Sequence, residues 1–516
     1  MLIIDKTKQL IIKMKRVFKY LTLIFFLLAS FLYGVYTGTV NNNYIHNKKR
    51  LLLNSKTIAS NYFKQINSNV ENINIKLSKP NRKSLQNQIE KASKIKIINK
   101  DSTKWLEAKI SVNKTESPGK LKIKGLFLNE FEWKEKCFSF SVKLNKTKFR
   151  ELSKFYLHYP KKRLLLTEWY GDILLRKLNL ISQKNYFATL SIDSEDKGLY
   201  LIEEKFNKNL LKNNQREEGP IVFFSKKQLR DHNFDYSEFY NNAAISFQYH
   251  HRNNQRAKEL LEGYRTGVLS PKQVFNFEKT ATLFALTELV GYVHHLQLHN
   301  IKFYYNSKED LLEPIANDFQ FQHIKKWTEE TLFLAGIKNN NNRILLAWAE
   351  KLYQDQKFLF LLIQKLKKIS NTEFLESLFI DIREEEEEAK LIMSIFNPLY
   401  IPDIKEKIIK NSQQINYILK NPAELEMLLS LTDKSLIYKS KSYLPIIPVS
   451  ICKDSSLVYR FEENTLLNPN SFGEPLQSDT FHLKKINLRE PNKALIFNYK
   501  ILGDTTELFH QIQAIN

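Results

Sequence analysis

Two side chains that could share a metal ion flank a predicted hairpin in the middle of the chain. Residues 301–305 (IKFYY) and 311–315 (LLEPI) have the composition of short strands, and a polar turn joins them. Asn300 comes just before the first strand and Asp318 just after the second. An antiparallel pairing would bring this amide and this carboxylate together, and both are suitable oxygen ligands for a divalent cation. An ordinary surface hairpin with turn-forming Asn and Asp at its ends is the alternative interpretation.

The composition limits the class of protein that carries this hairpin. A chain of 516 residues predicts about two to four domains. Its hydrophobic content of 43% and aromatic content of 12% are typical of packed domains rather than of a disordered chain. The net charge of +24 favours phosphate-bearing ligands, anionic lipids or acidic polymers as partners. No zinc spacing, helix-turn-helix signature or RNA-binding aromatic motif is present, so we expect no nucleic-acid partner.

The two cysteines, Cys137 and Cys452, exclude a disulfide framework. We expect two unpaired thiols, and a single bridge between them is the alternative.

The N-terminal segment predicts a membrane anchor. Residues 20–40 contain no charged side chain, and this is enough chain to cross a bilayer at about 20 residues per span. Basic residues crowd the segment before it, which favours a cytoplasmic N-terminus. We therefore predict an uncleaved signal anchor, with a cleaved signal peptide as the alternative. The body of the protein would then lie outside the cytoplasm, in a single-pass protein of the cell (inner) membrane.

The remaining chain alternates between strand-like and helical patterns. Alternating apolar and polar residues predict strands at 105–112, 120–126 and 138–144, and a strand pair at 187–192 and 198–203. Helical spacing predicts helices at 167–180, 274–294, 351–369 and 404–419. The acidic run at 384–388 predicts a solvated helix face, with a site for basic partners as a minor alternative.

Five blocks of sequence, in order, resemble the CotH-type (spore coat protein H-like) atypical protein kinase family. The resemblance covers about residues 105–320, somewhat under half of the chain. The blocks are LKIKG at 121–125 with KEKCFSFSVK at 134–143, YPKKR at 159–163 with the Glu-Trp pair that follows, GLYLIEEKF at 198–206, NNQREEGPIVFF at 213–224, and residues 284–318, which contain the hairpin.

The resemblance implies an α+β fold with a bilobal protein-kinase-like core after the transmembrane helix, followed by a helical region and a small β-rich module. The implied segments are a basic cytoplasmic N-terminus (1–19), the signal anchor (20–40), a polar stalk (41–102), the CotH-like kinase core (103–335), the helical region (336–440) and the β-rich module (441–516).

The implied activity is that of a bacterial, membrane-anchored kinase that transfers the γ-phosphoryl group of ATP to Ser or Thr of surface or envelope proteins. In this resemblance Asn300 and Asp318 match the pair that holds Mg²⁺. Glu203 and Glu204 match a motif in which one glutamate pairs with a lysine that contacts the phosphates of ATP.

The lysine and the general base are less clearly defined by the resemblance. Lys136 and Lys143 both lie in the matching block, although the default interpretation of Lys143 is a strand lysine that faces solvent. Protein kinases place an Asp five residues before the metal-binding Asn, whereas this chain has His295 there. His294 and His299 are the other two candidates for a catalytic base.

A second class of function stays open at the level of sequence. The missing Asp, the uncertain lysine and the scarcity of ATP outside the cytoplasm favour a catalytically inactive, CotH-like pseudokinase or scaffold that binds a protein or a surface polymer. Phe-Gln rather than Phe-Gly also follows Asp318. A zinc hydrolase built on the three histidines is weaker, because no Cys or third-ligand spacing supports it.

Overall fold

The computed structural model describes residues 70–515, with internal gaps. The gaps fall at residues 97, 99–102, 126–136, 164, 226–239, 241–242, 320–346, 354, 397–401, 421–424, 431–433, 441–444, 455, 463–464, 468–478, 484–493 and 504–506. The predicted basic N-terminus, the signal anchor and the first part of the stalk therefore lie outside the described residues. Within the described part, no helix is both long and apolar enough to cross a membrane.

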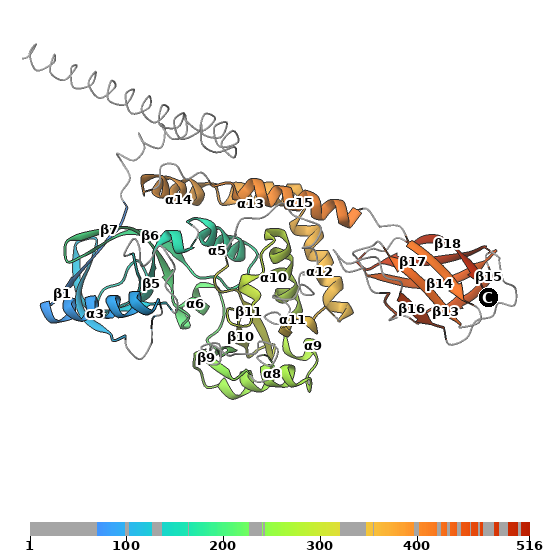
Figure 1. The fold of residues 1–516 in the computed structure, drawn as a ribbon, viewed down its shortest axis with the longest axis horizontal. Coiled ribbons are helices and arrows are strands. Elements are labelled where there is room, and N and C mark those ends of the chain that lie inside the picture. Colours follow the sequence, from blue (N-terminus) through green and yellow to red (C-terminus); the bar gives the residue numbers. More distant parts are fainter. Residues whose placement is uncertain are drawn as a thin grey trace, which may run out of the picture. The chain divides into compact units, whose positions relative to one another are not determined.

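A closed seven-stranded barrel forms the first part of the described chain (Figure 1). Its strands follow the order β1-β2-β3-β4-β5-β7-β6. They span Asn72–Leu77 (β1), Leu106–Val112 (β2), Thr115–Lys124 (β3), Ser139–Leu144 (β4), Lys154–His158 (β5), Asn185–Ile192 (β6) and Glu195–Glu204 (β7). The helix α3 (Lys79–Ile95) contacts β1 and β2. Residues 72–95 of the predicted stalk are thus a barrel strand and the helix beside it.

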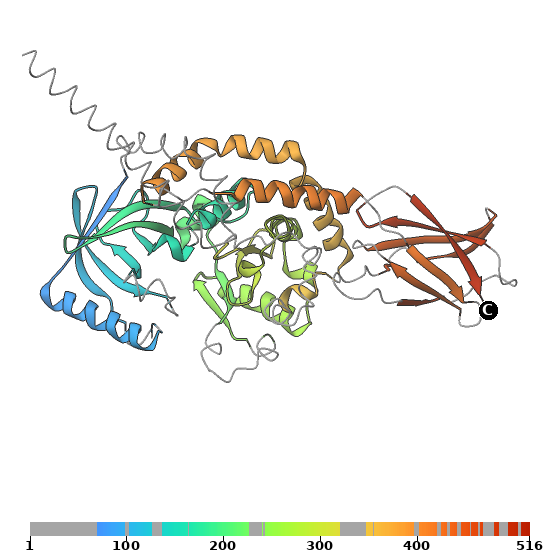
Figure 2. The same cartoon turned by 45° about the horizontal axis from the view of Figure 1, so that its top comes forward.

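Alternation of side chains along the strands explains why the barrel closes. In β1 the residues at every second position, including Ile73 and Ile75, are fully buried inside the barrel. Ile75 is paired with Ile110 of β2 on one side and with Ile192 of β6 on the other. Because β1 bonds to both neighbours, neither β2 nor β6 is left with an open edge. Figure 2 shows the barrel strands, blue to green, curving round this common interior.

A four-stranded sheet and a group of helices form the second part. The sheet has the order β11-β10-β8-β9, with β8 (Ile221–Phe224), β9 (Ile245–Tyr249), β10 (Lys302–Asn306) and β11 (Leu311–Ile315). The helices are α5 (Thr167–Lys177), α6 (Lys208–Asn213), α8 (Asn254–Thr266), α9 (Pro271–Val274), α10 (Phe277–Val290), α11 (Ala347–Glu350), α12 (Gln356–Ile369), α13 (Thr372–Asp381), α14 (Arg383–Phe396) and α15 (Ile404–Lys420), with short 3₁₀ turns at η1 (Pro160–Arg163) and η3 (His294–Leu296).

A second seven-stranded sheet ends the chain. Its order is β15-β14-β17-β18-β12-β13-β16. The strands are β12 (Leu425–Ser430), β13 (Ser435–Ser440), β14 (Ile446–Lys453), β15 (Ser456–Arg460), β16 (Asp479–His482), β17 (Ala494–Ile501) and β18 (Glu507–Ile515). Cys452 lies in β14, and within the described residues neither it nor Cys137 forms a disulfide.

The predicted fold class is wrong. A bilobal protein-kinase-like core does not fit a closed seven-stranded barrel accompanied by two further sheets. The physical reason is the strand β1, which the polar composition of residues 41–102 concealed. Its short apolar alternation supplies the seventh strand, and its parallel pairing with β6 joins the two ends of what would otherwise be an open sheet.

The packing of the barrel interior predicts that shortening a buried side chain there will strongly destabilise the protein. We expect Ile75→Ala to lower the free energy of unfolding by about 2–5 kcal/mol, because it leaves a cavity in a closed core. Ile95→Ala is the matched control, since Ile95 is 59% exposed at the end of α3, and it should cost less than ~0.5 kcal/mol. Denaturant unfolding measures both changes, and equal losses would contradict the barrel packing.

Candidate functional site

A charged cluster is built from the outer face of the barrel. Interior residues alternate with outward ones along each strand, so Lys124 of β3, Tyr156 and His158 of β5 and Glu203 of β7 share the outside. The register pairs Tyr156 directly with Glu203. Lys124 Nζ lies 3.6 Å from Glu203 Oε1 and 2.9 Å from His158 Nε2. The lysine and the glutamate therefore meet at the ends of β3 and β7, which are separated by two other strands of the barrel.

The guanidinium of Arg163 holds this cluster together. Arg163 ends η1, just after β5. Its Nη1 lies 2.5 Å from Asp318 Oδ1, its Nη2 lies 2.9 Å from Glu203 Oε2, and its Nε lies 3.1 Å from Glu168 Oε2. The side chain is only 8% exposed. One buried cation thus contacts three carboxylates, which come from α5, from β7 and from the segment after β11.

The pKa values of the three carboxyl groups are shifted in different directions. Burial would raise the pKa of Glu203, but Lys124, Arg163 and His158 outweigh it and hold that pKa well below the usual range. Burial is likewise outweighed at Asp318, whose pKa Arg163 and Lys124 lower. Burial raises the pKa of Glu168 well above its usual value, and the negative Glu203 and Asp318 add to the effect. The pKa values of Glu203 and Asp318 are therefore shifted down, while that of Glu168 is shifted up.

The two remaining polar groups respond to the same burial. Burial lowers the pKa of Lys124 to about 8, with Glu203 acting in the opposite direction. Burial, Arg163 and Lys124 together lower the pKa of His158 to about 3. The His158 ring is therefore neutral, and its Nε2 can accept hydrogen bonds from Lys124 (2.9 Å) and from Arg163 Nη2 (3.0 Å).

The hairpin places Asn300 and Asp318 at one end. In β10 and β11, Lys302 is paired with Ile315, so the residues just before β10 and just after β11 lie at the same end of the ladder. Asn300 is buried, and its Nδ2 donates a hydrogen bond to the carbonyl oxygen of His294 at 3.0 Å. Asp318 follows with a left-handed backbone (φ 59°). The predicted hairpin is confirmed.

The donor set fits a hard divalent cation. One oxygen from each of Glu168, Glu203 and Asp318 lies within 4.8 Å of the other two, and carboxylate oxygens are the ligands that Mg²⁺ prefers. Arg163 binds Oδ1 of Asp318, whereas Oδ2 has no hydrogen bond or ion pair to any residue that the structure describes. Asp318 therefore keeps one oxygen for a metal ion while the guanidinium stays in place.

The predicted histidines do not converge on one role. His295 is fully buried, with its Nε2 2.7 Å from Thr287 Oγ1 and its ring 4.1 Å from that of Phe319. Burial lowers its pKa well below the usual value, so it packs as a neutral core residue. His294 and His299 are half-buried, with ring centroids 5.7 Å apart.

The three remaining predicted residues are Glu204, Lys143 and Lys136. Glu204 is fully buried, and it accepts hydrogen bonds from the backbone N–H of Lys184 at 3.2 Å and from Asn213 Nδ2 at 2.9 Å. Burial raises the pKa of Glu204 to about 7. Lys143 lies on β4 and has no ion pair with a described residue. Lys136 lies outside the described residues.

Sequence reasoning missed Lys124, His158, Arg163 and Glu168. All four fall in or next to blocks that were already singled out, at 121–125 and 159–163. The alternation of β3 was the available signal, because Leu121 and Ile123 point inward and therefore send Lys124 outward.

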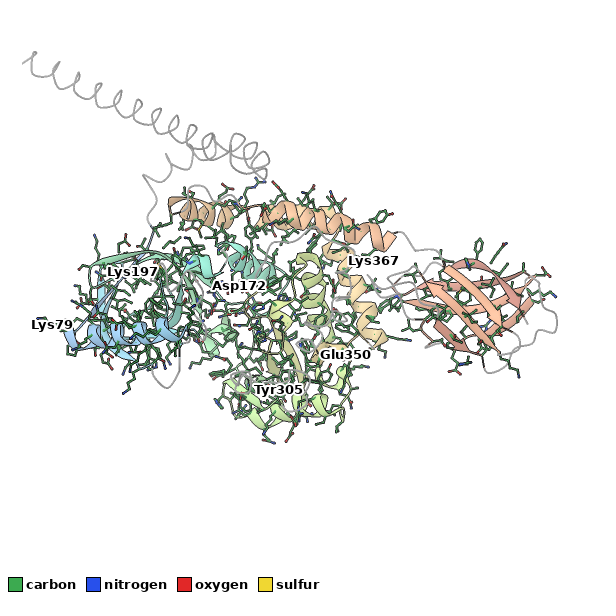
Figure 3. All side chains as sticks on the ribbon, in the orientation of Figure 1. Lys79, Asp172, Lys197, Tyr305, Glu350 and Lys367 are labelled. Atoms are coloured by element: carbon green, nitrogen blue, oxygen red, sulfur yellow. The ribbon has the colours of Figure 1, made fainter. Side chains whose placement is uncertain are left out.

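A cavity of about 470 Å³ lies next to this cluster rather than at the Asn300 end of the hairpin. Asp172, labelled in Figure 3, and Gln183 are among its lining residues. Gln183 Nε2 also donates to Glu203 Oε1 at 3.2 Å. The amide of Gln183 therefore connects the cavity wall to the charged cluster.

No family model matches this chain, and no curated protein matches it. Membership of the CotH-type family thus stays a prediction from the residues that carry the resemblance.

Removing the guanidinium of Arg163 should destabilise the folded protein. We expect Arg163→Ala to cost about 3–5 kcal/mol of unfolding free energy, because it leaves buried carboxylates without their partner. Arg82→Ala is the matched control, since Arg82 pairs with Asp193 at 2.7 Å on the surface, and it should have a much smaller effect. Urea unfolding of both variants measures the difference. Similar losses would show that Arg163 does not organise the cluster.

The neutral His158 predicts a pH dependence of stability. The unfolded ring binds a proton near pH 6.5, whereas the folded ring stays neutral down to a pKa of about 3. The unfolded state therefore binds more protons as the pH falls between these values, and stability drops. When the pH is lowered from 6.5 to about 4, we expect the melting temperature of His158→Gln to fall less than that of the wild type. The exposed His250→Gln is the control, and it should follow the wild type.

Proposed function

We propose that this chain is a metal-dependent phosphotransferase that moves the γ-phosphoryl group of ATP to Ser or Thr hydroxyls of surface or envelope proteins. The observation that carries the proposal is the Lys124–Glu203 ion pair (3.6 Å) in the same buried cluster as Asp318. A lysine held by a glutamate, next to a metal-binding aspartate, is the arrangement that positions phosphates in kinases. The charge-free segment at 20–40 supports a single-pass location with the catalytic part outside the cytoplasm.

Each charged residue has a defined task in this proposal. Lys124 contacts the phosphates of ATP, and Glu203 keeps its amine in place. Asp318 and Asn300 would hold Mg²⁺, which would neutralise the charge of the transferring phosphoryl group. The raised pKa of Glu168 disfavours a further negative charge beside the incoming phosphates. Arg163 balances Glu203 and Asp318, so the empty cluster is stable without a ligand.

The proposal does not depend on a strong general base. His295 is buried in the core, which removes the histidine at the kinase base position. His294 and His299 stay candidates, because both are partly exposed near Asn300. Phosphoryl transfer depends mainly on positioning and charge neutralisation, so the reaction does not require a carboxylate at that position.

One observation favours the non-catalytic alternative, a pseudokinase-like scaffold. The guanidinium of Arg163 contacts all three carboxylates, so it already supplies the positive charge that a metal ion would bring. If Arg163 does not yield to Mg²⁺ and ATP, the cluster is a structural element and the chain binds a protein or surface polymer without chemistry.

Substitution of Asp318 tests the proposal. In the full-length protein with Mg²⁺ and [γ-³²P]ATP, we expect the wild type to incorporate ³²P and Asp318→Asn to lose this incorporation, because its second oxygen no longer carries charge for the metal. Asp310→Asn is the matched control, since Asp310 lies in the turn of the same hairpin and pairs with Arg256 on the surface. It should retain activity.

Substitution of the lysines separates the roles within the same experiment. Lys124→Met should weaken Mg²⁺-ATP binding about tenfold or more, because a hydrogen bond to a charged group contributes ~1.5–3 kcal/mol. Lys143→Met should leave nucleotide binding unchanged. ATP binding without transfer would point to a missing substrate or to a pseudokinase. Absence of nucleotide binding by the wild type would exclude the kinase proposal and leave the non-catalytic scaffold.

A further inference from the structure

Four lysines form a row across the outer face of the barrel, beside the proposed phosphotransfer site. In the register of the sheet, Lys120 of β3 is directly opposite Lys143 of β4, and Lys143 is directly opposite Lys154 of β5. The pairing of Phe155 with Glu204, continued by one residue pair, sets Lys205 opposite Lys154. We call these four residues the lysine row.

The positive charge of the lysine row is largely unbalanced. Lys120 has an ion pair, with Glu107 at 2.5 Å. Lys143, Lys154 and Lys205 make no ion pair with any residue in the described part of the chain. Like charges placed directly opposite one another destabilise a sheet. The row therefore costs stability in the free protein, and a multiply anionic ligand would relieve this repulsion.

The lysine row is continuous with the charged cluster. Two residues further along β5, on the same face, Tyr156 lies opposite Glu203. At ~3.4 Å per residue this pair is about 7 Å from the lysine row. Lys205 Nζ lies 4.5 Å and Lys124 Nζ 3.5 Å from the centre of the Tyr156 ring. Burial lowers the pKa of Lys205 to about 8, and the nearby Lys124 and Lys154 add to this effect. A ligand on the row would thus end beside Lys124 and Glu203.

The length of the row matches an extended peptide. Three spacings of ~4.8 Å between neighbouring strands give a row about 14 Å long. An extended chain rises ~3.4 Å per residue and directs every second side chain to one face, so about five residues cover the row with acidic side chains ~7 Å apart. The long lysine side chains adjust to such a spacing.

We propose that the lysine row binds an acidic segment of the protein that receives the phosphoryl group, and so sets its substrate class as Ser or Thr next to Glu and Asp. This inference rests on the proposed phosphotransfer and adds the substrate class to it. The row presents charge rather than apolar surface, so it selects by charge complementarity and accelerates encounter with acidic partners.

Binding of short labelled peptides tests the inference independently of catalysis. Fluorescence anisotropy compares a peptide of Ser and Glu with the same peptide carrying Gln in place of Glu, using the full-length protein. The row variant combines Lys143→Gln, Lys154→Gln and Lys205→Gln. Its control combines Lys79→Gln, Lys83→Gln and Lys91→Gln on α3, which removes the same charge from another exposed surface of the barrel (Lys79 is labelled in Figure 3).

The expected result is that the wild type and the α3 control bind the Glu peptide at least about tenfold more tightly than the Gln peptide, and that the row variant loses this preference. Mg²⁺-ATP affinity should be unchanged in the row variant. Equal loss in both variants would mean that net charge alone attracts the peptide. A parallel loss of ATP affinity would assign the row to the nucleotide phosphates. Either outcome, or unchanged peptide binding by the row variant, overturns the inference.

Catalysis is scored separately. If the wild type incorporates no ³²P but still binds the Glu peptide through the row, the phosphotransfer proposal fails, and with it the assignment of the peptide as an acceptor. If the wild type is active, the KM for an acidic Ser peptide should rise in the row variant while kcat is retained. A fall in kcat with an unchanged KM would contradict docking on the row.

Discussion

The contact of one guanidinium with three carboxyl groups is the constraint on which the site depends. Arg163 joins Glu203 of the barrel, Glu168 of α5 and Asp318 after the hairpin. None of these groups could be buried alone, because an isolated charge in a protein interior costs several kcal/mol. The cluster reduces this cost by pairing two cations with two carboxylates, and burial shifts the pKa of Glu168 upward, toward the neutral form. The same arrangement fixes Asp318 at the end of the hairpin.

The strict alternation of β7 gives adjacent residues different roles. Leu201 belongs to the core outside the barrel, whereas Ile202 belongs to the core inside it. The next pair follows the same rule. Glu203 points outward to Lys124 and Arg163 and is held charged, while Glu204 is bound by Lys184 N–H and Asn213 at the barrel end. Two neighbouring glutamates therefore divide between an electrostatic cluster and a structural hydrogen-bonding position.

Charge is organised locally in ways that net charge does not reveal. The acidic run at 384–388, expected to be a solvated helix face, includes Glu386, which is almost fully buried and bonds to the hydroxyl of Tyr170 and to Lys390 and Lys405. Conversely, three amines of the lysine row have no carboxylate partner among the residues that the structure describes. An acidic run thus serves helix packing, while unbalanced lysines gather beside the site where a phosphoryl group would be transferred.

The sequence by itself determined the local elements, because short-range periodicity and turn composition encode them. It predicted the hairpin, the buried α10, most strands of the barrel and the position of Asn300 and Asp318 at one end of the hairpin. Only the tertiary structure decided that β1 closes the barrel, that Lys124 rather than Lys143 meets Glu203, and that His295 is a core residue. These outcomes depend on pairing across long stretches of chain and on burial. Arg163 and Asp318 are 155 residues apart, and no local pattern records that they meet.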